Sequence, residues 1–433
     1  MKWLSMLGAL LLIAACVSDR VANDSLDEIA ADYVQMTLEI GEREPGYVDA
    51  YYGPPEWADA AQAAPRSVAD LAREAAALAA RTNAIDAASL EPLEQRRRAF
   101  LIAQLRAAST RLRMLQGEKL SFADEAEGLF GVRPELAPLS TFDPVLARIE
   151  ALVPGPGPLS ERVDAFQGRF TIPTDRLKPI FDAAIAECKR RTAAYIALPA
   201  GETFTMEFVT DKSWSGYNYY KGDLTSLIQI NTDLPIRISR AVDLGCHEGY
   251  PGHHAYNMLL ERNLARGRGW VEYMVYPLHS PQSFIAEGSA NYGIELAFPG
   301  NERLQFERRV LYPLAGISDA GADVYIQLQD AIRELSGARI AIAADFLDGR
   351  IDRDEAIRRT QRYSLMSESR ARQSIAFTEQ YRSYVINYGL GRDLVAGYIE
   401  RGGANPRTRW ATLARMLSEP FLPGSLTGAA TTR

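Results

Sequence analysis

The 433-residue chain has no excess of positive charge and almost no clustering of basic residues. Its net charge is −7, and its Lys and Arg residues are scattered apart from the short run Arg96 to Arg98, which fits a solvated helix face. This distribution argues against a nucleic-acid-binding protein. With 47% hydrophobic and 24% charged residues, the composition is that of a globular protein long enough for one large domain or two lobes.

The apolar run near the N-terminus, Leu4 to Ala15, is too short to span a bilayer but has the length of the apolar part of a signal peptide. It leads into Cys16 in a sequence that resembles a bacterial lipobox. This resemblance implies a lipoprotein signal peptide of residues 1–15, cleavage before Cys16 and lipidation of that residue; an ordinary signal peptide with a chance cysteine is the alternative. Val17, where some lipoproteins have Asp, favours the outer membrane of a Gram-negative cell, facing the periplasm. The lipid anchor would be the only membrane contact.

Cysteine is scarce as well, because only Cys188 and Cys246 remain beyond Cys16. These two residues could form a disulfide in an oxidising compartment. Residues so far apart in the sequence reveal nothing about their distance in space, however, so nothing in the sequence supports the disulfide.

Helical periodicity dominates the chain and predicts a mainly α fold, with two lobes, a cleft between them and a small β-sheet. An apolar stripe from Val68 to Leu78, for example, has Ser67 in position to cap the start of a helix. The sequence PGPGP, Pro154 to Pro158, cannot continue a helix. It predicts a soft boundary between an N-terminal helical lobe, residues 16–153, and a catalytic region, residues 154–433. One continuous domain is the alternative.

An aromatic segment, Val48 to Trp57, lies between the signal-peptide pattern and this helical stripe. Its two prolines, Pro54 and Pro55, predict a loop. A packed loop is the simpler interpretation, and aromatic rings that line a cleft are the alternative.

Two segments with strand patterns precede the histidine-rich part of the chain. Phe204, Met206 and Phe208 alternate with polar residues, and SLIQINT, Ser226 to Thr232, is a second strand candidate. A long helical pattern then runs from Pro235 to Arg262. We therefore expect a small sheet beside that helix. Later helical patterns cover Leu304 to Leu311, Ala320 to Leu347 and Glu355 to Tyr388.

Histidine, a common metal ligand, is also scarce in the chain. The chain has four histidines, and three of them fall within the eight residues HEGYPGHH, His247 to His254. The motif begins like the zinc-binding HExxH sequence, but its second histidine arrives late. A metal site with altered geometry and a helix end with buried structural histidines are the two interpretations, and the clustering favours the metal site.

The spacing of this motif requires a distorted helix. On a straight helix His253 lies about 9 Å along the axis from His247, which two zinc–nitrogen bonds of about 2.0–2.1 Å do not easily bridge. Pro251 cannot donate a hydrogen bond to the carbonyl of His247 and crowds it, and Gly249 and Gly252 allow the backbone to bend. The motif therefore predicts a kink or bulge that moves His253 towards His247.

A catalytic zinc site would need a base and a third protein ligand. Glu248, beside the first histidine, is the expected general base, which takes a proton from a water activated by the metal. Catalytic zinc sites have three protein ligands and one open position. Glu272, His279 and Glu287 are the candidates for the third ligand, and the spacing alone does not choose among them. Asn291, one helical turn after Glu287, is placed to hold a ligand by a hydrogen bond.

Hydrolysis would also need a hydrogen-bond donor for the oxyanion that forms as water attacks a carbonyl. The candidates are His254, His279, Arg382, Tyr384 and Tyr388. Core packing or a surface salt bridge is the simpler role for any single one of them, but we expect at least one to act as the donor.

HEGYPGHH, followed by EGSANYG from Glu287 to Gly293, resembles the bacterial family known as domain of unknown function 885, DUF885. The motif of that family is HExxPGHH followed by EGxAxY. The family is similar to the gluzincin metallopeptidases, in which two His and one Glu bind zinc. The segments YNYYKGDLTSLIQINTDLP and YRSYVINYGLGRDL extend the resemblance over most of residues 200–400. This chain differs from the family at Ser289, where Trp is frequent, and in having no histidine after His279.

The resemblance implies a ligand set and a role for one strand. His247, His253 and Glu287 would bind zinc, with Glu248 as the base. SLIQINT would be an edge strand beside the active-site helix that pairs with a peptide substrate through Ile228, Ile230 and Asn231, which lie on or near that edge. An interior strand with both edges covered is the alternative.

Together these patterns predict a zinc-dependent hydrolase that cleaves peptide amide bonds, with one Zn²⁺ per chain and a peptide as its partner. A lipoprotein that binds metal or peptide without turnover is one alternative. A structural lipoprotein without metal, in which the histidines only cap a kinked helix, is another.

Overall fold

The computed structural model describes residues 25–427 of the chain. The predicted signal peptide, residues 1–15, and the lipidation site Cys16 lie outside the described residues. Between residues 25 and 427, no helix has the length and apolarity needed to cross a membrane.

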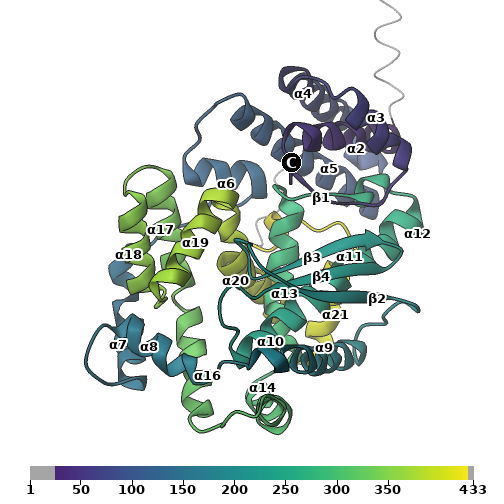
Figure 1. The fold of residues 1–433 in the computed structure, drawn as a ribbon. Helices are drawn as coiled ribbons and strands as arrows, with labels where there is room; N and C mark the ends of the chain where they lie inside the picture. The colour runs from purple at the N-terminus through teal and green to yellow at the C-terminus, as the bar shows by residue number, and fades with distance from the viewer. Residues whose placement is uncertain (1–24, 428–433) are drawn as a thin grey trace, which may run out of the picture.

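Helices make up most of the described structure, which confirms the predicted mainly α fold (Figure 1). The helices before the main sheet are α2 (Leu26–Arg43), α3 (Pro55–Ala63), α4 (Val68–Ala84), α5 (Pro92–Leu115), α6 (Phe122–Phe130), α7 (Asp143–Leu152), α8 (Leu159–Gly168) and α9 (Leu177–Ala193). Those after it are α10 (Ile238–Leu244), α11 (His253–Leu260), α12 (Arg266–Arg268), α13 (Pro281–Ala297), α14 (Glu302–Phe306), α15 (Tyr312–Ala315), α16 (Ala322–Arg333), α17 (Ser336–Leu347), α18 (Arg353–Tyr363), α19 (Glu368–Tyr381), α20 (Ile386–Glu400) and α21 (Pro406–Met416).

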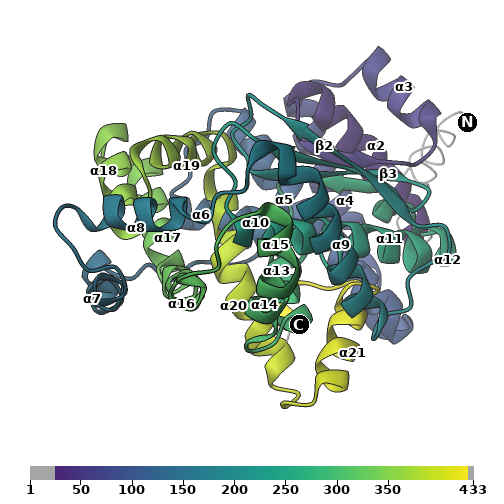
Figure 2. The same ribbon diagram turned by 60° about the horizontal axis from the view of Figure 1, so that its bottom comes forward.

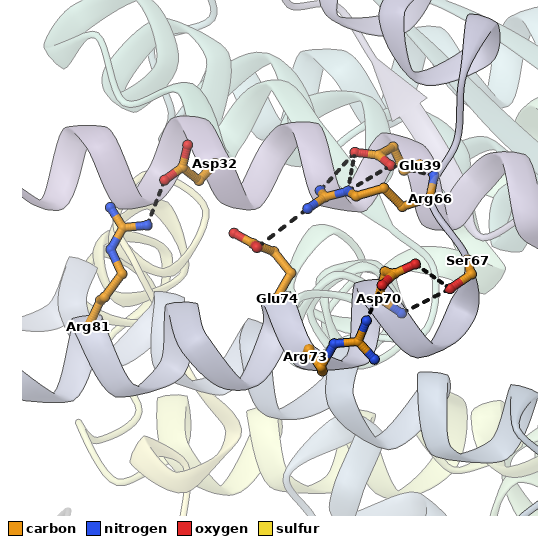
Figure 3. A network of polar contacts seen from close by, with 8 residues as sticks. All are labelled: Asp32, Glu39, Arg66, Ser67, Asp70, Arg73, Glu74 and Arg81. Atoms are coloured by element: carbon orange, nitrogen blue, oxygen red, sulfur yellow. Dashed lines mark hydrogen bonds and ion pairs between the residues drawn. The ribbon is translucent and has the colours of Figure 1, made fainter.

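Helix α4 starts where the sequence supplies a cap. Ser67 accepts a hydrogen bond from the backbone N–H of Asp70 and caps α4, as predicted. Beside this cap, Arg66 forms an ion pair of 2.8 Å with Glu39 of α2 (Figure 3). Further along the same two helices Arg81 lies 2.7 Å from Asp32. These charge pairs flank an apolar contact between α2 and α4, whose facing side chains are buried in one cluster.

The strands form two small sheets. In the larger sheet the order is β2 (Thr203–Val209), β4 (Thr225–Asn231) and β3 (Gly216–Gly222), with β2 parallel and β3 antiparallel to β4. The smaller sheet pairs β1 (Val48–Tyr51) with β5 (Val275–Pro277).

The expectation for the SLIQINT segment, strand β4, was wrong. This strand lies in the middle of the sheet and forms ladders on both sides, so it is not an edge strand. Ile228 and Ile230 are buried in the main core. The strand of this sheet that lines the cavity beside His247 and Glu248 is β3, through Gly216 to Asn218. The aromatic segment that begins at Val48 is likewise a strand at its start, not a loop throughout.

Buried apolar side chains form one large cluster and two smaller ones. The large cluster surrounds β4, α11 and α13, and α13 packs along α20. Figure 2 shows α7, α8 and α16 to α19 gathered on one side of the molecule, away from α2, α3 and α4. Ile149 of α7 and Val163 of α8 belong to the same small cluster. The PGPGP stretch is therefore a turn between two helices that share a core.

Cys188 of α9 and Cys246 are bonded as a disulfide. The bond ties α9 to the segment that carries His247 and spans 58 residues of sequence. Closing a loop of that length stabilises a fold by about 4 kcal/mol, chiefly by restricting the unfolded chain.

We expect the double variant Cys188→Ser, Cys246→Ser to lose about 4 kcal/mol in the free energy of unfolding, measured by urea denaturation. Reductant should destabilise the wild-type protein by a similar amount and leave the double variant unchanged, which is the control. Equal unfolding midpoints for both proteins without reductant would contradict the expectation.

Candidate metal centre

The histidine motif is bent in the way that its proline and glycines predicted. Helix α10 ends at Leu244 and runs into a π-helical turn, η4 (Gly245–Gly249), which carries His247 and Glu248. The chain then breaks its helical course at Tyr250–Pro251, a cis peptide bond, and α11 starts at His253.

Two glycines make this bend sterically possible. A Cβ atom on Gly252 would lie 1.8 Å from the backbone oxygen of His247, so no other residue fits there without moving the chain. A Cβ on Gly293, in the middle of α13, would lie 2.6 Å from the ring of Pro251. The bend is therefore packed directly onto α13, the helix that carries Glu287.

His247, His253 and Glu287 converge on one point. The two Nε2 atoms of His247 and His253 lie 3.2 Å apart, and the Glu287 carboxylate oxygens lie 3.1 Å from His247 and 3.6 Å from His253. Atoms bound at about 2.0–2.1 Å to a tetrahedral zinc lie about 3.3–3.4 Å from each other, so these spacings fit a metal ligand set. Glu287 Oε2 is also buried without a hydrogen-bond partner among the described residues. This triad could hold a metal ion.

The charges of the triad are strongly coupled. Burial alone would raise the pKa of Glu287, but His253 and His247 together hold it well below its ordinary value. Burial opposes protonation of His253, yet Glu287, Glu248 and Asp49 together raise its pKa to about 9. The triad therefore favours a bound positive charge. A divalent cation supplies that charge when it binds in place of the proton on His253.

Glu248 lies beside the triad but is not part of it. Its side chain lines the same cavity, and burial raises the pKa of its carboxyl, an effect that His247 and His253 oppose. A Cβ atom on Gly216 would lie 2.8 Å from Glu248 Oε1, so the glycine leaves room for the carboxylate. Asn218 donates a 2.7 Å hydrogen bond to the backbone oxygen of Glu248. Strand β3 thus positions Glu248 from the outside.

A cavity of about 1060 Å³ opens onto these residues. Consecutive residues 213–218 form part of its wall, so the start of β3 and the loop before it run along the cavity. Helices α13, α17, α19 and α20 supply much of the rest of the wall. The triad and Glu248 are therefore nearly buried but reachable from a space large enough for a peptide segment.

Tyr384 and Tyr388 both reach the site, as the sequence suggested. The Tyr384 hydroxyl donates a 2.9 Å hydrogen bond to Glu287 Oε1. The Tyr388 ring lies 6.4 Å from the His247 ring, between centroids, and its hydroxyl makes no hydrogen bond with any residue from 25 to 427. Burial raises the pKa of each phenol well above its ordinary value, so both hydroxyls stay protonated as donors.

Two predicted oxyanion donors lie elsewhere. His254 has a fully buried side chain, and its ring nitrogens lie 2.8 Å from Ser226 Oγ and 3.0 Å from Glu202 Oε2. Arg382 donates a 2.8 Å hydrogen bond to Glu125. Neither residue lines the cavity, so the expectation that they act on the substrate does not agree with their placement. Both side chains have structural partners instead.

The other ligand candidates are also occupied or remote. Glu272 receives two hydrogen bonds from Arg97, at 2.6 and 3.0 Å, and is not near the triad's cavity. His279 lies behind Tyr384, with 6.5 Å between ring centroids, and burial lowers its pKa to about 3. Asn291 donates to the backbone oxygen of Glu287 at 2.9 Å, as helix geometry allows, and so does not hold the carboxylate itself.

Asp49 is a carboxylate at the site that the sequence did not indicate. It lines the cavity from β1, accepts a hydrogen bond from Tyr217, and burial raises its pKa to about 7. Its segment carries no motif, and it precedes the histidines by about 200 residues. Only the pairing of β1 with β5, the strand that leads into α13, brings it here.

No family model matches the chain, and no match occurs among the curated proteins. Among solved structures, the fold is similar to "the putative lipoprotein from Colwellia psychrerythraea", with a TM-score of 0.50 and 17% sequence identity. The match covers 82% of this chain and 65% of the other, so this chain spans about two thirds of that protein's length. At this identity, the likeness concerns the mainly α architecture alone.

Proposed function

We propose that the protein is a zinc-dependent hydrolase that cleaves peptide amide bonds. The observation that carries the proposal is the convergence of His247, His253 and Glu287, with Glu248 beside them in one cavity. Two imidazoles and a carboxylate suit zinc among the common divalent ions. The same residues carry the resemblance to the DUF885 family.

The chain's own residues would act in a fixed order. When bound, the metal supplies a Lewis acid that polarises a carbonyl and makes water more acidic. Glu248 accepts the proton of the attacking water and returns it to the leaving amine. Tyr388, whose hydroxyl has no other partner among the described residues, donates to the developing oxyanion. Tyr384 holds Glu287 in place.

The shape of the site supports a peptide as the substrate. Strand β3 forms its ladder with β4 on one side only, and its start lies in the cavity wall. An extended peptide would pair with the outer edge of β3 near Gly216 and Asn218 and so pass beside Glu248.

The cell envelope is the location that we propose for this activity. The lipobox-like sequence at Cys16 supports a lipid anchor, and the disulfide between Cys188 and Cys246 fits an oxidising compartment such as the periplasm. The protein of similar fold from Colwellia psychrerythraea has a name that includes the word lipoprotein. Within the cell envelope we propose the outer membrane, and Val17 is the one residue on which that choice rests.

The test of the function is hydrolysis of a mixture of synthetic peptides with blocked N-termini, followed by mass spectrometry. We expect new peptide ends that disappear after chelation and return when zinc is added. Intact peptides with a folded, metal-loaded protein would instead favour the second candidate, a lipoprotein that binds metal or peptide without turnover.

Substitutions of Tyr388 and Tyr384 are expected to change different properties, the turnover rate and the metal affinity. Tyr388→Phe should lower kcat roughly 100-fold or more and leave metal affinity unchanged, because it removes an oxyanion donor. Tyr384→Phe should weaken metal affinity roughly 10- to 100-fold, because it removes the hydrogen bond that orients Glu287. Measuring kcat at saturating metal and titrating the metal for both variants makes each the control for the other. Identical profiles for the two variants would contradict these roles.

A further inference from the structure

Arg339 places a guanidinium without a partner in the wall of the metal cavity. It lies on α17 and lines the same cavity as the triad. Its Nε atom is fully buried and has no hydrogen-bond partner. The whole guanidinium forms no hydrogen bond or ion pair with any residue between 25 and 427, and its only ring contact is with Phe377.

The other arginines of the cavity wall do have partners. Arg303 lies 2.7 Å from Asp243, and Arg392 lies 2.8 Å from Glu295. Among the remaining three, Arg240 lies 3.6 Å from Asp243 and Arg333 pairs with Asp330. Arg370 lies 4.0 Å from Asp164 and donates to the backbone of Pro235. Arg339 is thus the one cavity arginine of the described chain whose charge is not met.

Arg339 is connected to the metal centre by a row of rings. Its guanidinium carbon lies 5.8 Å from the ring of Phe377, whose centroid lies 6.0 Å from that of Tyr388. Tyr388 in turn lies 6.4 Å from His247. The guanidinium therefore stands further along the cavity from the triad, on the same wall, where a part of the substrate beyond the scissile bond would lie.

An unpaired guanidinium in the wall of the metal cavity favours the binding of an anion. Burial lowers the pKa of Arg339, but an arginine side chain remains protonated in proteins. Nε of Arg339 is buried, whereas the side chain as a whole is half-buried and faces the cavity, so a ligand that supplies the opposite charge there gains from pairing with it. The planar fork of guanidinium donors matches a carboxylate, which it binds through two parallel hydrogen bonds.

We propose that Arg339 is a specificity-determining residue that binds a carboxylate of the peptide substrate. This inference rests on the proposed function of the triad and Glu248. The carboxylate has two sources in a peptide, the free C-terminus and the side chains of Asp and Glu. Arg339 selects for peptides that present either one a short distance from the cleaved bond.

The test compares three mixtures of N-acetylated peptides with the same length and, apart from one Glu in the third, the same composition. The first has free C-termini and no acidic side chains, the second has amidated C-termini, and the third has amidated C-termini and one Glu. We expect the wild-type protein to cleave a carboxylate-bearing mixture with a kcat/KM roughly 10- to 100-fold above that of the amidated one. Cleavage of the first or of the third mixture identifies the source of the carboxylate.

Variants show whether Arg339 causes the preference. Arg339→Gln should reduce it to near unity, Arg339→Lys should retain part of it, and Arg392→Gln, in the same cavity but paired with Glu295, should retain it in full. Thermal unfolding of each variant establishes that it is folded. Equal cleavage of all three mixtures by wild type, or an unchanged preference in Arg339→Gln, would overturn the inference while the hydrolase function stands.

Binding separates this inference from the proposed function. The same mixtures are titrated into the wild-type and Arg339→Gln proteins in the presence of zinc under conditions without cleavage, with Glu248→Gln as the background. Preferential binding of carboxylate-bearing peptides that depends on Arg339, without any cleavage by the wild-type protein, would contradict the proposed hydrolase function and support the inference about Arg339. Binding without such a preference, or no binding, would overturn the inference.

Discussion

Replacing Glu248 by Gln is expected to lower the rate of peptide hydrolysis about 10²- to 10⁴-fold. Gln has nearly the same shape but no basic carboxylate, so it cannot take the proton of the attacking water. Glu248 is not one of the three residues that converge on the candidate metal position, so metal affinity should change little. The measurement is kcat/KM on a cleaved peptide, together with metal content and thermal unfolding.

Glu334→Gln is the matched control for this variant. Glu334 also lines the cavity, but its carboxylate pairs with Arg148. We expect this variant to keep its activity. A Glu248→Gln protein with full metal content and activity close to wild type would contradict the role of Glu248 as the base.

Replacing Glu287 by Gln is expected to weaken metal affinity by more than about 100-fold, because even residues that only support a ligand contribute 10- to 100-fold. Glu287 supplies the only carboxylate of the triad and lies 3.1 Å from His247. Its loss leaves two imidazoles, which bind metal weakly. Activity should fall in parallel and should recover in part only at high metal concentration. Metal titration of the chelated protein measures this effect.

The same helix supplies the control. Glu295 follows Glu287 by two helical turns on α13 and also lines the cavity, but it pairs with Arg392. Glu295→Gln should therefore bind metal like the wild type. Equal affinity of the Glu287→Gln and wild-type proteins would show that Glu287 is not a ligand.

The bend in the histidine motif could be predicted because the residues that cause it lie within the eight residues of the motif. Pro251 cannot continue the helix, and Gly252 alone tolerates the close approach of the His247 carbonyl, so a bend was required. The structure realises it as a π-helical turn followed by a break. The mainly α fold could be predicted in the same way, because each helix has its own periodic pattern of apolar residues.

Features that depend on distant partners could not be predicted. The place of β4 in the sheet depends on β3, whose sequence GYNYYKG has no clear alternation of apolar and polar residues, although its residues alternate between buried and more exposed in the structure. His254 and Arg382 have the spacing of catalytic residues, but Glu202 and Glu125 bind them. The helical pattern from Glu355 to Tyr388 is divided among three helices, and the second break is at Arg382, with a φ of 54°.

The central claim is that His247, His253 and Glu287 form a metal site, and metal content tests it most directly. The purified protein, saturated with zinc and then dialysed, should contain about one zinc per chain by mass spectrometry of the metal. His247→Ala and His253→Ala should contain none while they remain folded. A well-folded wild-type protein without bound metal after this treatment would contradict the claim and leave HEGYPGHH as a bent helix with a structural role.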